Sequence, residues 1–350
     1  MEKFSHGGNI YGLGGNKGKR IYDFSANINP LGIPRQAQKV LRSQINEVVN
    51  YPDPQARKLV AEIADYWKIK PENVLVGNGS AELLYDIVRL LKPKTACVPI
   101  PSFSEYERAL KIADCRINFL RLKENEDFAG DLTKVQPADM FLFGHPNNPT
   151  ANMIAADKKT LLKLRFKHFV ADEAFMDFVP GENKYSFIKE AVKNKKLTVL
   201  RTFTKFFALP GLRIGYVAAH KDVIAKLREI QVPWTVNVMA QLAALEMLRN
   251  KAYAEKTKIL IAREQKWLFD ELRGIAFLKV YPSLVNFLLV KIKRKNITAE
   301  KLRECLIRKG VLIRDCANFR GLGKFFFRVA VRTRKENKIL VKGLKVILCR

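Results

Sequence analysis

Short apolar runs alternate with amphipathic helical segments from about residue 55 to residue 201, and this alternation constrains the fold more than any other feature. Strand cores are expected at 74–76, 96–99, 117–120, 140–143, 169–171 and 197–201, with helices at 56–67, 81–91 and 106–112 between them. Apolar strands that are separated by helices are typical of a mostly parallel sheet with both faces covered. The pattern therefore predicts an α/β fold around such a sheet.

The pattern changes after about residue 235. Residues 238–273 are expected to form one or two long helices, followed by strands at 278–280, 287–290, 311–313 and 326–331 around a helix near 299–309. This predicts a smaller α+β C-terminal domain. Six glycines between residues 7 and 18 predict a flexible N-terminal arm that packs with this domain. We therefore expect an arm and segment over 1–45, a large domain over 46–237 and a small domain over 238–350.

The composition limits the class of protein. The formal net charge of +29 is compatible with a basic nucleic-acid-binding face, but no recognition motif accompanies it, so we favour a lysine-rich enzyme surface without a nucleic-acid partner. The chain has no apolar run of about 20 residues and no signal-peptide pattern at its N-terminus, so we expect no membrane association. Five scattered cysteines without a C-x-x-C pair predict reduced thiols in the cytoplasm, and we expect no metal site.

Three segments contain residues that could react with or bind a ligand, and each segment follows an expected strand. They are 144–150 (GHPNNPT), 171–175 (ADEAF) and 202–213 (TFTKFFALPGLR). Ligands of open α/β sheets bind at the carboxyl ends of strands, so the three segments are expected to meet at one site.

Two residues in these segments have surroundings that single them out. Lys205 lies next to apolar residues, and desolvation would lower its pKa and favour the reactive amine. Asp172 ends an apolar strand, where a carboxylate is costly without a cationic partner. Taken alone, Lys205 could be a solvated surface group and Asp172 a helix cap. The order of the three segments favours a shared site.

Together these segments resemble the fold-type I aminotransferases, which depend on pyridoxal 5'-phosphate (PLP), and the resemblance extends over nearly the whole chain. It implies that Lys205 forms the Schiff base with PLP and that Asp172 pairs with the pyridine nitrogen. It also implies cofactor contacts for seven further residues and, through Tyr51, a phosphate contact in the partner subunit of a homodimer. The seven residues are Gly79, Ser80, Ala81, Phe103, Asn148, Thr202 and Arg213.

A narrower resemblance concerns the substrate. The segments 6–9 (HGGN), 23–32, 314–318 and 327–332 resemble the threonine-phosphate decarboxylases of cobalamin biosynthesis, with the histidinol-phosphate aminotransferases next. This implies decarboxylation of L-threonine O-3-phosphate to (R)-1-amino-2-propanol O-2-phosphate. It also implies substrate contacts for His6, Gly7, Asn27, Asn148, Arg314 and Arg328.

Our hypothesis is that Arg314 and Arg328 clamp the substrate phosphate while His6 closes over it. Histidinol-phosphate amino transfer to 2-oxoglutarate, serine-phosphate decarboxylation and nucleic-acid binding remain the alternatives. A single methyl distinguishes threonine phosphate from serine phosphate, and that difference is too small for the sequence to decide.

Overall fold

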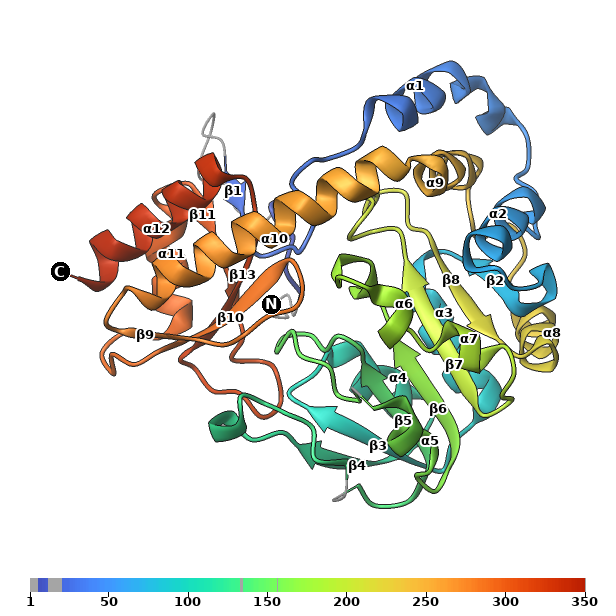
Figure 1. The fold of residues 1–350 in the computed structure, drawn as a ribbon, viewed down its shortest axis with the longest axis horizontal. Coiled ribbons are helices and arrows are strands. Elements are labelled where there is room, and N and C mark those ends of the chain that lie inside the picture. The colour runs from blue at the N-terminus through green and yellow to red at the C-terminus, as the bar shows by residue number, and fades with distance from the viewer. Residues whose placement is uncertain (1–5, 12–20, 133–134, 156, 350) are drawn as a thin grey trace.

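The computed structural model describes residues 6–11, 21–132, 135–155 and 157–349. Over these ranges the chain forms a larger and a smaller lobe, with the long helix α10 (Lys251–Arg273) running between them (Figure 1). Most of the glycine-rich stretch expected to form the arm, residues 12–18, lies outside the described residues.

A seven-stranded sheet forms the centre of the larger lobe, with strand order β2-β8-β7-β6-β5-β3-β4. In this order the strands are β2 (Val74–Gly77), β8 (Gly215–Ala219), β7 (Leu197–Thr202), β6 (Phe166–Asp172), β5 (Ala138–Gly144), β3 (Thr95–Ile100) and β4 (Arg116–Arg121). Strand β8 runs opposite to the other six strands, which are parallel to one another. The predicted mostly parallel sheet is confirmed. Strand β8 was not predicted, because its apolar run directly follows a segment that contains proline and glycine.

The strands of this sheet are buried on both faces, which explains their continuous apolar runs. In β5, Met140 and Leu142 pack with the helices of one face, whereas Phe141 and Phe143 pack on the opposite side. The first face is covered by α3 (Gly79–Leu91), α4 (Ser104–Ile112) and α8 (Lys221–Ile230). The remaining helices of this lobe are α2 (Arg57–Trp67), α5 (Lys158–Leu162), α6 (Glu182–Tyr185), α7 (Ile188–Ala191) and α9 (Val238–Arg249).

The smaller lobe contains an antiparallel sheet in the order β12-β13-β10-β9, packed with α10, α11 (Ala299–Ile307) and α12 (Arg334–Leu348). Its strands are β12 (Arg314–Asp315), β13 (Phe326–Ala330), β10 (Phe287–Ile292) and β9 (Leu278–Val280). The strand expected at 311–313 is in fact split. Its first part, β11 (Val311–Leu312), pairs with β1 (Tyr22–Asp23), and the chain then passes to β12 in the other sheet.

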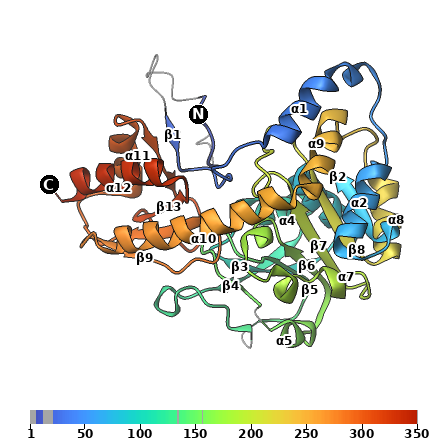
Figure 2. The ribbon, with the colours of Figure 1, turned by 45° about the horizontal axis from the view of Figure 1, so that its top comes forward.

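The N-terminal segment contacts both lobes. Strand β1 pairs with β11 of the smaller lobe, whereas α1 (Arg35–Ser43) packs on α9, which in turn packs on α2 (Figure 2). The division of the chain into residues 1–45, 46–237 and 238–350 therefore stays a prediction.

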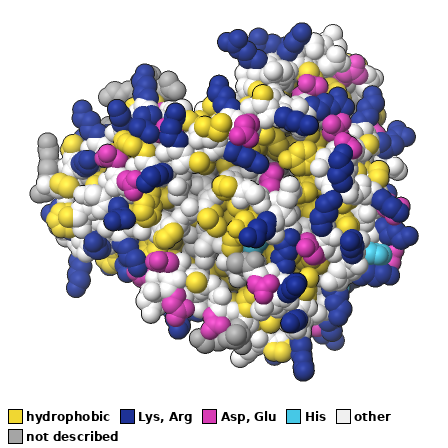
Figure 3. Space-filling view, in the orientation of Figure 1, with side chains coloured by type: hydrophobic (Ala, Val, Ile, Leu, Met, Phe, Trp, Pro, Cys, Tyr) yellow, Lys and Arg dark blue, Asp and Glu magenta, His cyan; other side chains and the backbone are white. Residues whose placement is uncertain are grey.

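The basic residues that give the chain its high positive charge do not form a single patch on the face that Figure 3 shows. Lysine and arginine side chains are spread over that face, with acidic side chains between them (Figure 3). None of the helices in the described part of the chain has the length and apolar character needed to cross a membrane.

Candidate active site

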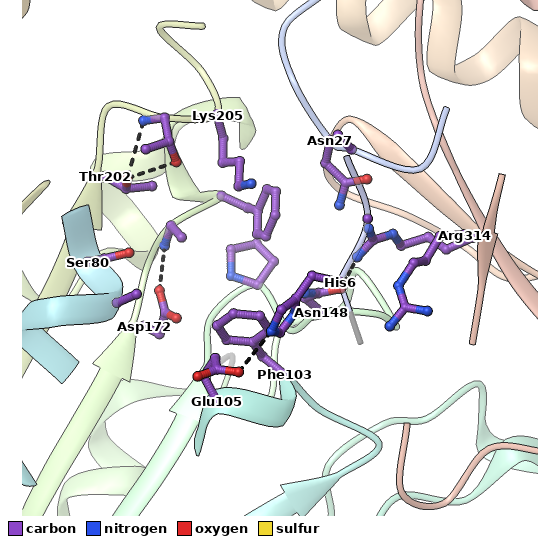
Figure 4. A pocket seen from close by; sticks show the side chains of 18 of the residues that line it. His6, Asn27, Ser80, Phe103, Glu105, Asn148, Asp172, Thr202, Lys205 and Arg314 are labelled. Carbon is purple, nitrogen blue, oxygen red and sulfur yellow. Dashed lines mark hydrogen bonds and ion pairs between the residues drawn. The ribbon is translucent and has the colours of Figure 1, made fainter. Parts of the chain in front are cut away.

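A cavity of about 440 Å³ lies at the carboxyl ends of the central strands, where the smaller lobe meets the larger one (Figure 4). Most of the residues singled out in the sequence line it, as do several that were not. The predicted residues in its lining are His6, Gly7, Asn27, Ser80, Ala81, Phe103, Asn148, Asp172, Thr202, Lys205, Arg213, Arg314 and Arg328. Gly79 does not line the cavity itself, but it lies against the side chain of Arg213, which does. Tyr51 is absent from the lining.

Three neighbouring strands bring the central residues together. Asp172 ends β6, Thr202 ends β7, and Asn148 follows β5 by four residues. These strands are parallel and adjacent, so their carboxyl ends open on one edge of the sheet. The convergence expected from the three segments is therefore present.

Asp172 is buried beneath this cavity, and two hydrogen bonds hold its carboxylate. Its Oδ2 accepts from the Tyr106 hydroxyl at 2.8 Å, and its Oδ1 accepts from the Ala174 backbone N–H at 3.0 Å. Burial raises the pKa of Asp172, and the two hydrogen bonds partly oppose that shift. Tyr106 was not identified from the sequence. A tyrosine on the apolar face of an expected helix could have pointed to this contact, because a buried tyrosine hydroxyl normally requires a hydrogen-bond partner.

Lys205 points into the same cavity from the turn after β7 (Figure 4). Burial lowers the pKa of its amine to about 8, and the nearby guanidinium groups of Arg328 and Arg213 act in the same direction. The carboxylate of Asp172 acts in the opposite direction, with a smaller effect. Near physiological pH, the neutral fraction of this amine is therefore larger than that of an ordinary lysine, and the neutral amine is the form that reacts with a carbonyl carbon.

A positively charged corner lies next to Lys205, formed by the N-terminus of α3 and by Arg213. Gly79 has a φ of +83°, and a Cβ at this position would come within 2.5 Å of Arg213 Nη2. The backbone conformation favours glycine, and the missing Cβ leaves room for the guanidinium to approach the start of α3. The amides of the first turn of α3 and this cation are suited to a phosphate group.

Two arginines face each other on the smaller-lobe side of the cavity. Arg314 on β12 and Arg328 on β13 are direct cross-strand partners, and both are buried. Arg328 donates to Ser25 O at 2.8 Å and to Asn148 Oδ1, and Arg314 donates to Asn318 Oδ1 at 2.7 Å. Burial lowers the pKa of Arg328 to about 10, with a contribution from Arg314. Like charges directly opposite each other are unfavourable, so the pair is suited to an anion between or above them.

The N-terminal segment closes the cavity from outside. A Cβ on Gly7 would lie 2.1 Å from Ser25 O, so only glycine allows the chain to pass at this point. Gly8 N donates to Ser25 Oγ at 2.8 Å, and His6 Nε2 lies 2.9 Å from Glu105 Oε1. Ser25 and Glu105 were both missed in the sequence, because their roles depend on contacts between distant segments.

The remaining predicted residues occupy distinct positions. Phe103 lies 5.7 Å from the His6 ring, measured between centroids, and Asn27 Oδ1 is buried without a hydrogen-bond partner among the described residues. Tyr51 is 83% exposed and packs on Trp234, and its expected role in a partner subunit stays a prediction.

Comparison with known proteins identifies relatives over nearly the whole chain. The aminotransferase class I and II family profile matches residues 19–344. A provisionally named threonine-phosphate decarboxylase of Caldanaerobacter subterraneus subsp. tengcongensis is 39% identical over 99% of this chain and 94% of its own. The threonine-phosphate decarboxylase of Salmonella typhimurium is 34% identical over 98% and 96%. A histidinol-phosphate aminotransferase of Thermoanaerobacter pseudethanolicus is also 34% identical, over 93% of each chain.

Two solved structures show the same fold. The L-threonine-O-3-phosphate decarboxylase of Porphyromonas gingivalis superposes with a TM-score of 0.84 at 26% identity, covering 93% of this chain and 99% of its own. The histidinol-phosphate aminotransferase of Clostridium acetobutylicum gives the same TM-score at 33% identity, covering 93% and 98%. The backbone fold alone therefore does not distinguish the two reactions.

Proposed function

The chain belongs to the class I and II aminotransferase family of PLP-dependent enzymes, and on this premise we propose that it decarboxylates L-threonine O-3-phosphate. The observation that carries the proposal is the facing pair Arg314 and Arg328 in a cavity that also contains Lys205 and Asp172. Two buried guanidinium groups at one end of the cavity favour a substrate with a phosphate group, and an amine at the other end favours PLP chemistry.

The residues in the cavity fit the cofactor. The close approach of Arg213 to Gly79, at the N-terminus of α3, makes a cradle that a Cβ would fill, and this cradle would hold the cofactor phosphate with Ser80 and Thr202. Asp172 is buried without a basic side chain among its hydrogen-bond partners in the described residues, so a protonated ring nitrogen would supply its counter-charge. Phe103 would pack on the ring, and Asn148 would contact its phenolic oxygen.

When bound, PLP withdraws electrons from the substrate α-carbon and so allows a bond at that carbon to break. The protein side chains then determine which bond is affected. Asp172 would hold the positive charge at the ring nitrogen. Lys205 would hold the cofactor until the substrate amino group takes its place, which frees Nζ to move a proton. After carbon dioxide leaves, Lys205 Nζ, or a water molecule beside it, would return a proton to the α-carbon.

Orientation distinguishes decarboxylation from amino transfer. The bond that breaks must stand perpendicular to the ring, so a decarboxylase must keep the substrate carboxylate out of the ring plane. Three arginines line the cavity in the described part of the chain: Arg213, Arg314 and Arg328. If Arg213 binds the cofactor phosphate and the other two bind the substrate phosphate, none of these three remains to hold the carboxylate near the plane. The arm with His6, which the sequence links to the decarboxylases, supports the same reaction.

A direct assay tests the proposal. The purified protein with PLP is supplied with L-threonine O-3-phosphate and no keto acid, and carbon dioxide and the aminopropanol phosphate product are measured. We expect both products in equal amounts, and we expect Lys205→Ala to abolish their formation. Turnover that occurs only with histidinol phosphate and 2-oxoglutarate would establish the rival, which the identity to histidinol-phosphate aminotransferases favours. O-phosphoserine is assayed in parallel, because its decarboxylation is the third possibility.

The assembly is proposed to be a homodimer. Tyr51 packs on Trp234, and both are exposed, as are the valines close to them in the sequence: Val48, Val49 and Val232. Such exposed apolar side chains favour burial against a second copy, where Tyr51 would reach the neighbouring site. Light scattering of the purified protein is expected to give twice the mass of 40.0 kDa. A monomeric mass would contradict the proposed assembly.

The cytoplasm is proposed as the compartment of the protein. All five cysteines are free thiols, as expected in a reducing environment.

A further inference from the structure

Glu105 is an acidic side chain in a cavity that is otherwise rich in cations. It is the second residue of α4 and is 8% exposed, and it lines the same cavity as Arg213, Arg314 and Arg328. A carboxylate near the binding site of a phosphorylated substrate repels that substrate unless another group neutralises it. We therefore expect neighbouring groups to reduce this repulsion, and Glu105 to have a role that explains its position.

Partners from two other segments occupy both oxygens of this carboxylate, and Arg108 Nη1, one turn later on α4, lies 3.7 Å from Oε2. Oε1 lies 2.9 Å from Nε2 of His6, and Oε2 accepts from the Tyr85 hydroxyl of α3 at 2.6 Å. Figure 4 shows the contact between His6 and Glu105 at the edge of the cavity. Burial and the nearby Glu105 raise the pKa of Tyr85 to about 12, so Tyr85 remains a donor. Because an ionised carboxylate only accepts hydrogen bonds, Nε2 of His6 is the nitrogen that donates to it.

The helix terminus does not account for this arrangement. A carboxylate in the first turn of a helix is stabilised by the helix dipole wherever its side chain points. Glu107 lies in the same first turn and pairs with Arg320 outside the cavity. Of these two carboxylates, only Glu105 is directed at the N-terminal segment, 99 residues earlier in the sequence.

We propose that Glu105 is a positioning residue that, with Tyr85, holds the His6 ring at the mouth of the cavity, beside the end that Arg314 and Arg328 line. The Glu105 contact fixes the tautomer and orientation of the ring, and the Ser25 contact with Gly8 fixes the backbone two residues later. The Arg108 guanidinium, 3.7 Å from Oε2, offsets part of the repulsion between Glu105 and a phosphorylated substrate. This inference rests on the proposed function for the identity of the substrate, but the docking of the arm can be measured without it.

Hydrogen exchange tests the docking directly. Amide exchange of residues 6–11 is measured by mass spectrometry on the PLP-loaded protein without substrate, for the wild type and for Glu105→Gln, Tyr85→Phe and Glu126→Gln. Glu126 is a control, because it pairs with Lys123 on an exposed turn. We expect exchange at the arm to increase at least about 5-fold in Glu105→Gln, to increase less in Tyr85→Phe, and to stay unchanged in the control. Unchanged exchange in Glu105→Gln would overturn the proposal.

Kinetics then test the link to substrate. Glu105→Gln is expected to raise KM for threonine phosphate about 5- to 30-fold while kcat changes less than about 2-fold. His6→Asn should have a similar effect, and the double variant should be no worse than either single variant, because both remove the same contact. Additive effects would refute a shared role. If the wild type does not act on threonine phosphate at all, the proposed function fails, while the exchange data still decide whether Glu105 positions the arm.

Discussion

Lys205 is a lysine whose environment disfavours its own charge. Burial and two arginines lower the pKa of the amine to about 8. The unfolded chain holds this proton up to the ordinary lysine pKa, so the charged form destabilises the folded protein throughout the pH range below about 8. The same property that makes the amine reactive therefore reduces the stability of the protein without cofactor.

This conflict predicts a pH-dependent gain in stability for Lys205→Met. In the cofactor-free protein we expect the variant to be more stable than the wild type by about 2–3 kcal/mol at pH 7.5. Between pH 8 and the ordinary lysine pKa, the unfolded wild type carries more protons than the folded one. Its stability therefore rises with pH, and the difference from the variant shrinks. Urea unfolding at several pH values measures this difference. A stability gain of Lys205→Met that stays constant with pH would show that the lowered pKa of Lys205 is not its cause.

Gly7 allows the arm to pass Ser25, because a Cβ there would collide with a backbone oxygen. Gly7→Ala should therefore displace the arm and raise KM for threonine phosphate about 10-fold, with less than about 0.5 kcal/mol lost in global stability. Steady-state kinetics and thermal unfolding measure the two effects. Gly323→Ala is the matched control, since a Cβ at that position would meet no neighbouring atom of the described residues within 4 Å. An unchanged KM for Gly7→Ala would show that the arm does not contribute to substrate binding.

At the scale of elements, the register of two short strands determines the end of the cavity proposed to bind the substrate phosphate. Because Arg314 pairs with Arg328 across β12 and β13, their side chains emerge on the same face of the sheet. A shift of one residue would send one of them to the opposite face. The break between β11 and β12, which the sequence pattern did not predict, is what brings Arg314 into this register.

Substitution in this pair tests its role as an anchor. We expect Arg314→Lys to raise KM for threonine phosphate about 10- to 100-fold, because lysine cannot reproduce a two-pronged contact with phosphate. Arg308→Lys, on the exposed end of α11, is the control and should behave as the wild type. The measurement is steady-state kinetics with threonine phosphate over a wide concentration range. A KM in Arg314→Lys that stays close to that of the wild type would exclude an anchoring role.

At the scale of the whole molecule, the cavity exists only because two lobes meet. Arg320 of the smaller lobe donates to both carboxylate oxygens of Glu107 on α4, at 2.9 and 2.7 Å, and its guanidinium stacks over Phe119. The neighbouring Phe319 lines the cavity and lies beneath the Arg314 guanidinium. This bridge therefore ties the loop that supports Arg314 to the larger lobe.

The bridge predicts an acid-dependent contribution to stability. Arg320 lowers the pKa of Glu107 to about 2, with help from Lys111 and against the effect of burial. A carboxylate with a lowered pKa stabilises the fold above its ordinary pKa, and this contribution is lost as pH falls toward the lowered value. Arg320→Ala should therefore cost less than about 1 kcal/mol at pH 7, because the pair is partly exposed, and nothing near pH 2. Denaturant unfolding of both proteins at pH 7, 4 and 3 measures the trend. A cost that is independent of pH would assign the effect to the lost packing on Phe119.

The sequence by itself determined the larger lobe and the chemistry at its sheet edge. Local periodicity defines strands and helices, and parallel strands place their carboxyl ends together, so the pattern alone is enough to expect Asp172, Asn148 and Lys205 at one site. The tertiary structure alone determined the contacts between segments far apart in the chain. Four such contacts depend on strand register and on the packing of two lobes. They are the hydrogen bond from Tyr106 to Asp172, the passage of Gly7 past Ser25, the facing arginines, and the contact between Glu105 and His6. These contacts leave no periodic signal in the sequence, because each joins residues whose local surroundings are unrelated.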